Sequence, residues 1–106
     1  MAWIYLFCAG ILEIVWAYYM KRSEGFTLLT PSVITIVTMI ASFLLLSLAM
    51  KTLPLGTAYT VWTGIGAVGA FLLGVAFLGE AATPTRILAA LFIVGGIVMM
   101  RLSGDA

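Results

Sequence analysis

The sequence contains no histidine, a single cysteine and few charged residues for its length. Charged residues account for 8% of its 106 positions, whereas a soluble domain carries about 25%. The lone cysteine, Cys8, excludes a disulfide within the chain, and we interpret it as a small buried apolar side chain. The low content of charged residues excludes an ordinary soluble domain.

Motifs for catalysis and for nucleic-acid binding are also missing. The sequence has no phosphate-binding loop, no cluster of metal ligands and no nucleophile–base pair. It has no basic stretch, and its formal net charge of +1 gives no reason to expect a nucleic-acid partner. We therefore expect no enzyme activity, no cofactor and no metal.

Apolar residues are abundant and make up 64% of the chain. A membrane-spanning helix needs about 20 of them in succession, and four such runs joined by short loops use up the whole sequence. The N-terminus lacks a basic leader and a cleavage site, so we expect the first run to be retained. Thr83 and Pro84 suit the N-cap and the first position of the last helix. We predict an all-α membrane protein with one domain over residues 1–106 and helices at about 3–20, 32–50, 57–78 and 84–101.

The short loops permit only antiparallel neighbours, so both termini should lie on one side of the membrane. Three basic side chains then lie on one side (Lys21, Arg22 and Arg86), and two lie on the other with the amino terminus (Lys51 and Arg101). Because basic residues favour the cytoplasmic side, this near balance is open to two interpretations. One is a weakly favoured single orientation, and the other is dual topology. Two oppositely oriented copies would supply the inverted symmetry that many transporters build around a midplane site.

Glu13 lies near the middle of the first apolar run, which is otherwise free of charge. An acidic residue at the centre of a membrane helix costs about 2.5–3.5 kcal/mol. No histidine is available, and every lysine and arginine lies outside the apolar runs. Burial disfavours the charged carboxylate, so Glu13 must hold a proton or a cation from outside the chain. A carboxyl group that binds a proton and a cation alternately is the central requirement of a proton-coupled cation exchanger, and we predict this function.

Aromatic and hydroxyl side chains lie in the spans around this depth. Trp16 is one helical turn from Glu13, and aromatic faces attract cations. Tyr59, Trp62 and Thr63 share a face of the third span, where the two aromatic rings would enclose a cation and Tyr59 would contact the carboxylate. Ser42 is near mid-depth, and two roles are open to it. It either orients the Glu13 carboxylate or bonds to a helix for structural reasons.

Glycine is concentrated in the third span and recurs in the fourth. Gly64, Gly66 and Gly69 indicate close helix packing, and clustered glycine also permits a bend between inward-open and outward-open shapes. The fourth span has no buried charge and no polar stripe. Its small residues among large aliphatics predict a contact between subunits at Ala90, Gly95 and Gly96.

Taken together, these motifs resemble the small multidrug resistance family over nearly the whole chain. No one motif is specific, but their combination is. The matching features are Glu13, Gly25-Phe26-Thr27, Pro31-Ser32 and the run from Pro54 to Tyr59 leading to Trp62. Trp16, the segment Lys51-Thr52-Leu53-Pro54 and the run from Trp62 to Ala67 are similar to the guanidinium exporters of that family.

The resemblance implies an antiparallel, dual-topology homodimer in the bacterial inner membrane, with both Glu13 carboxyls at one shared site. It implies proton-coupled export of guanidinium and small guanidinyl cations by alternating access, with protons, the cation, lipid and a second copy as partners. The residues implied to line the site are Glu13, Trp16, Ser42, Tyr59, Trp62 and Thr63.

Two other functions stay open. One is a polyspecific exporter of quaternary ammonium cations in the same family. A more distant one is a structural or regulatory membrane bundle in which Glu13 is protonated and bonded to a neighbour. A cation channel is disfavoured because tight aromatic stacking slows the departure of an ion.

Overall fold

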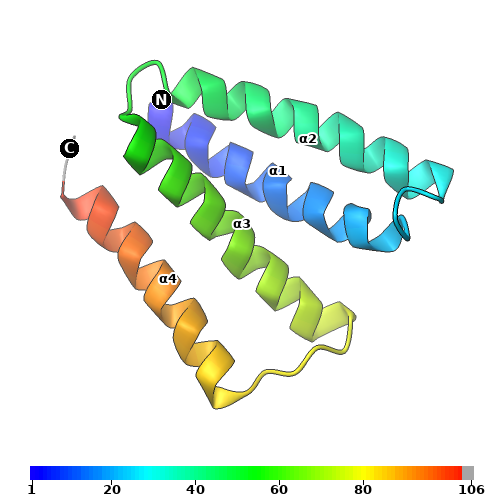
Figure 1. Cartoon of the computed structure of the whole chain (residues 1–106). Coiled ribbons are helices and arrows are strands. Elements are labelled where there is room, and N and C mark those ends of the chain that lie inside the picture. The colour runs from blue at the N-terminus through cyan, green and yellow to red at the C-terminus, as the bar shows by residue number, and fades with distance from the viewer. Residues whose placement is uncertain (104–106) are drawn as a thin grey trace.

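A computed structural model gives the structure of the protein and describes residues 1–103. Four helices, α1 to α4, account for most of them, and each is long and apolar enough to cross a membrane. Short loops join consecutive helices, so α1 begins and α4 ends at the same end of the molecule (Figure 1). The helices are α1 Ala2–Arg22, α2 Leu29–Ala49, α3 Leu55–Phe77 and α4 Pro84–Leu102.

The residues at which the helices begin and end can be explained by the side chains at those positions. The predicted second helix begins at residue 32, whereas α2 begins at Leu29. The earlier start is possible because Pro31 still lies in the first turn, where backbone N–H groups lack helical partners. α1 continues through Lys21 and Arg22, whose positive charges suit the C-terminal end of a helix. At the start of α4, the Thr83 hydroxyl accepts a hydrogen bond from the Arg86 backbone N–H at 3.3 Å.

The helices form a flat arrangement of 41 × 34 × 16 Å rather than a closed bundle. α1 packs against α2 and α3, whereas the backbone of α4 approaches that of α3 alone. Figure 1 shows α4 beside α3 at the edge of the arrangement, and α4 has no buried residue. The buried apolar core is small and lies where α1, α2 and α3 meet: Leu6, Ala9, Leu46, Ala49, Ala58, Val61 and Trp62.

One expectation about burial is wrong. Cys8 is exposed on α1 and not a buried core residue. Because lipid is apolar, a small hydrophobic side chain in a membrane helix loses nothing by facing outward.

The loop between α1 and α2 is held by Ser23, which is fully buried. Its hydroxyl donates to the Met20 carbonyl at 2.7 Å and accepts from the Phe26 N–H at 3.0 Å. Three successive residues then adopt left-handed backbone angles, with φ of 51° at Glu24, 75° at Gly25 and 66° at Phe26. Only glycine adopts this region freely. The Ser23 bonds therefore stabilise a turn that residues 24 and 26 disfavour.

We expect Ser23→Ala to lower the free energy of unfolding by about 1–3 kcal/mol, because it removes two hydrogen bonds from a buried position. Reversible unfolding in mixed detergent and dodecyl sulfate micelles, followed by far-ultraviolet circular dichroism, measures this change. The control is Ser47→Ala, since Ser47 is exposed on α2 and its hydroxyl forms no hydrogen bond to the described residues. Equal stability of the two variants would contradict the role given to Ser23.

Candidate functional site

Glu13 lies in the middle of α1 and its side chain is partly buried against α3. The carboxyl group rests on the backbone of α3 at Gly66. A Cβ atom added to Gly66 would overlap the Glu13 carboxyl and lie 2.7 Å from its Cγ. The Oε1 atom is buried and has no hydrogen-bond partner among the described residues. A carboxyl oxygen in this position is an acceptor that is left for a proton, water, a ligand or another chain to satisfy.

Ser42 joins three helices just beneath Glu13. Its hydroxyl donates to the Ala9 carbonyl of α1 at 2.7 Å and accepts from the Trp62 indole N–H of α3 at 3.0 Å. Ser42 and Ala9 are fully buried and Trp62 is 7% exposed. In an α-helix the Ala9 carbonyl also accepts the backbone N–H of Glu13. In this structure Ser42 therefore contacts the backbone that carries Glu13, and not its carboxylate.

Four aromatic rings form a continuous row from α1 to α3. The ring centroids of Trp16 and Phe43 are 6.3 Å apart, those of Phe43 and Trp62 are 5.8 Å apart, and those of Trp62 and Tyr59 are 5.6 Å apart. The indole nitrogen of Trp16 is buried without a partner among the described residues. The row thus joins three of the predicted site residues. Its fourth member, Phe43, is absent from the prediction, and the only sequence signal for it is its position next to Ser42.

The remaining predicted site residues point elsewhere in the single chain. Thr63 is exposed and lines a groove of about 400 Å³ between α3 and α4. Tyr59 also lines this groove while stacking on Trp62. Among residues 1–103, no hydrogen bond joins Tyr59 or Ser42 to Glu13. The structure therefore brings Glu13, Trp16, Ser42 and Trp62 to the junction of α1, α2 and α3, and leaves Thr63 on the α4 side.

The glycines of α3 mark close contacts with both neighbouring helices. A Cβ at Gly69 would overlap Ile14 of α1. A Cβ at Gly64 would lie 2.8 Å from the Ile97 side chain of α4. Together with Gly66, these positions show that glycine brings α3 close to α1 on one side and to α4 on the other.

The three small residues of α4 do not share one surface. Ala90 lines a small pocket with Phe71 and Arg86 on the side that faces α3. Gly95 and Gly96 are exposed, and a Cβ atom at either would meet no other atom within 4 Å. Gly96 lines the groove between α3 and α4 together with Thr63, whereas Gly95 lies about 100° away around the helix. Gly96 is therefore the small residue of α4 whose open surface adjoins a predicted site residue.

The described residues contain no group of three or more histidine, cysteine or acidic side chains that could hold a metal ion. The chemistry of the site is thus that of one carboxyl, one bridging hydroxyl and a row of aromatic rings. Such a site suits an organic cation with both N–H donors and a flat apolar face.

We expect Gly66→Ala to destabilise the protein by about 1–3 kcal/mol, because the added methyl would force α1 and α3 apart at Glu13. Gly56→Ala is the matched control. Gly56 also lies in α3, and a Cβ atom there would meet nothing within 4 Å. This control should be neutral or slightly stabilising, because alanine favours helix. Unfolding measured in mixed micelles compares the two, and a Gly66→Ala protein as stable as Gly56→Ala would contradict the close contact.

Comparison with known proteins gives one consistent result. The sequence model of the family described as Small Multidrug Resistance protein matches residues 1–103. The chain is 58% identical over 103 residues to a protein named guanidinium exporter from Citrobacter freundii, covering 97% of this chain and 98% of that protein. It is 58% identical, with the same coverage, to a guanidinium exporter from Salmonella typhimurium. It is 56% identical to one from Yersinia pseudotuberculosis, covering 97% and 99% of the two chains.

These matches extend over the whole of the described structure. With four apolar helices of membrane-spanning length, they make the protein a multi-pass protein of the bacterial inner membrane. The match to the family model and the identity to its members lead to one assignment: the chain belongs to the Small Multidrug Resistance family.

Proposed function

We propose that the protein exports guanidinium and small substituted guanidinyl cations in exchange for protons, by alternating access. The observation that carries the proposal is the Glu13 carboxyl, which is held in the membrane against Gly66 with a buried oxygen that has no partner among the described residues. The relatives that share 56–58% of their residues with this chain are named guanidinium exporters.

The chemistry of guanidinium suits the groups at this site. The ion is planar, and like the arginine head group it keeps its charge at any relevant pH. Its N–H donors match a carboxylate in a two-point fork. Its flat face can stack on the rings of Trp16 or Trp62, which flank Phe43 in the aromatic row. One carboxyl and one row of rings therefore supply both kinds of contact.

Exchange follows if protons and the cation compete for the same carboxyl. An unpaired carboxylate in the membrane is costly, so the site favours states in which Glu13 holds a proton or a cation. Binding of the cation then displaces protons from the carboxyl site, and binding of protons displaces the cation. The coupling requires no other titratable group in the spans, and Glu13 is the one acidic residue that the four helices contain.

A second, oppositely oriented copy completes the proposed site. Glu13 is only partly buried in the single chain, and the helices form a flat arrangement rather than a closed bundle. One side of the site is therefore left for another chain to cover. The exposed surface of α4 at Gly96, beside Thr63 in the groove between α3 and α4, suits a close contact with another helix. The basic residues, three at one membrane face and two at the other, favour neither orientation strongly.

The proposed exchange predicts that a pH gradient drives guanidinium uphill into proteoliposomes that contain the protein. Glu13→Gln should reduce this transport to the level of protein-free liposomes, because the amide can neither release a proton nor pair with the cation. Glu24→Gln is the control, since Glu24 is an exposed acid in the loop before α2, and it should transport like the unaltered protein.

Uphill transport by the Glu13→Gln protein would contradict the mechanism, and absence of transport by the unaltered protein would favour a structural bundle. A parallel sample with a tetra-alkyl or aromatic quaternary ammonium ion tests selectivity. Transport of both cations would favour the polyspecific alternative over the guanidinium exporter.

The dual-topology arrangement predicts labelling from both sides of the membrane. In a Cys8→Ser background, Ala81→Cys places one thiol in the exposed loop between α3 and α4, and Thr52→Cys places one at the opposite membrane face. A membrane-impermeant maleimide applied to spheroplasts should label about half of the copies of each variant, since oppositely inserted chains are equally needed. Full labelling of one variant and none of the other would show a single orientation.

A further inference from the structure

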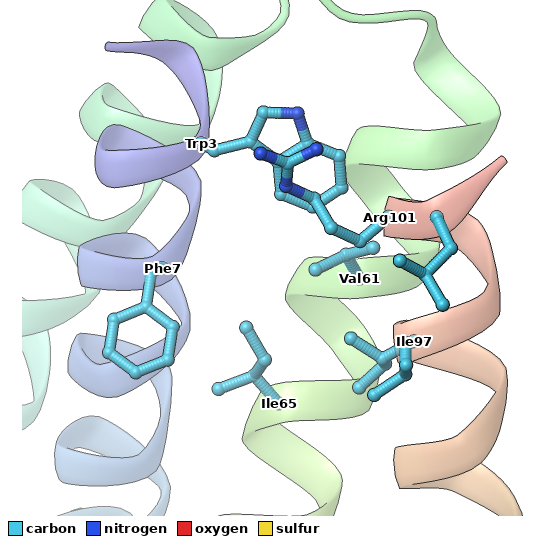
Figure 2. Close-up of a pocket in the computed structure, with 8 residues that line it drawn as sticks. Trp3, Phe7, Val61, Ile65, Ile97 and Arg101 are labelled. Carbon is cyan, nitrogen blue, oxygen red and sulfur yellow. The ribbon is translucent and has the colours of Figure 1, made fainter. Parts of the chain in front are cut away.

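A second pocket, which Glu13 does not line, opens toward the membrane face at which α1 begins and α4 ends. It has a volume of about 370 Å³ and opens between α1, α3 and α4. Figure 2 shows Phe7 of α1 and Ile97 of α4 on either side, with Val61 and Ile65 of α3 between them. The proposed exchange uses none of these side chains. Its lining is apolar except at one end.

At that end, Arg101 and Trp3 meet across the mouth of the pocket. The Arg101 guanidinium carbon lies 5.0 Å from the centre of the Trp3 ring, and Figure 2 shows the guanidinium beside the indole. Arg101 is in the last turn of α4 and is exposed. Tryptophan and arginine at the end of a membrane helix lie at the depth of lipid head groups. The pocket therefore has a cationic mouth at the head-group level and an apolar interior below it.

The charges at this membrane face are all positive among residues 1–103. Lys51 and the amino terminus lie at the same end as Arg101, whereas Glu24 and Glu80 lie in the loops at the opposite end (Figure 1). Arg86, at the other end of α4, differs because it pairs with Glu80 at 3.6 Å. The Arg101 mouth thus combines a basic group without an acidic partner among residues 1–103 with an apolar pocket.

We infer that this pocket binds an anionic phospholipid, with the phosphate on Arg101 and an acyl chain along the apolar wall. Guanidinium groups bind phosphate through paired N–H donors, and basic pockets between membrane helices are known to accept anionic head groups. The pocket shares only Ile97 with the groove that Thr63 and Gly96 line. A second copy of the chain seated on that groove therefore need not cover the pocket.

Native mass spectrometry of the purified protein with phosphatidylglycerol or phosphatidylcholine tests the inference. We expect the protein dimer to bind phosphatidylglycerol in preference. Arg101→Gln should weaken phosphatidylglycerol binding about fivefold, the effect of one basic residue near an anionic head group. Arg101→Lys, which keeps the charge, should retain most of the binding. Val98→Phe, which fills the apolar wall, should weaken the binding of phosphatidylglycerol with Arg101 still present.

Arg86→Gln is the matched control, because Arg86 lies on the same helix but is paired with Glu80. Circular dichroism of each variant verifies that its helices are intact. An equal loss in Arg86→Gln and Arg101→Gln would overturn the inference, since it would indicate general attraction to basic residues. Unchanged binding in Arg101→Gln would overturn it as well. Lipid bound to monomers and absent from dimers would show that a second copy occupies the pocket, which also overturns it.

Discussion

The close packing of α1 against α3 is the constraint on which the site depends. At Gly10, a Cβ atom would lie 2.6 Å from Ile65, and at Gly66 it would overlap the carboxyl of Glu13. Glycine on both helices brings the two backbones together where the membrane is least tolerant of charge. The carboxyl is thereby held against peptide backbone on one side and is left without a hydrogen-bond partner of its own. Any larger residue at Gly66 would therefore displace the Glu13 carboxyl from its position, even though the carboxyl group itself would be unchanged.

The second helix is attached to this pair through polarity as well as packing. Membrane helices gain little from apolar contacts with each other, because lipid offers the same contacts. The bonds from Trp62 to Ser42 and from Ser42 to Ala9 therefore contribute specificity that leucines cannot provide. α4 has no such attachment within the chain and no buried residue. Its backbone approaches that of α3 alone, and the contact from Arg101 to the Trp3 ring links it to α1 at one end, so most of its surface is left for contacts outside the monomer.

Features that depend on local composition could be predicted from the sequence. The four apolar runs, the Thr83 cap and the isolated acid at Glu13 each follow from residues within a few positions. Contacts between distant residues could not be predicted in this way. Ser42 and Ala9 are 33 residues apart, and no periodic pattern gives the rotation of one helix against another. The sequence therefore left two roles open for Ser42, and the structure supports the interhelical bond.

Two further differences have the same origin. The prediction grouped Thr63 with Tyr59 and Trp62 because the three share a face of one helix. That face is wide enough for Trp62 to contact α2 while Thr63 lines the groove beside α4. Cys8 was expected to be buried by the rule for proteins in water, which does not hold where the surroundings are lipid. In both cases the residue type could be read from the sequence, but the direction in which the side chain points could not be predicted from it.

The Ser42 hydroxyl carries a consequence for how the site can change. A serine has one hydrogen to donate, and here the Ala9 carbonyl receives it. The same hydrogen cannot be given to a carboxylate at the same time. Any arrangement in which Ser42 donates to Glu13 must first release the backbone of α1, and any return to the present arrangement must release the carboxylate. The two contacts are mutually exclusive, so the Ser42 hydroxyl can donate either to the Ala9 carbonyl of α1 or to the Glu13 carboxylate, but not to both at once.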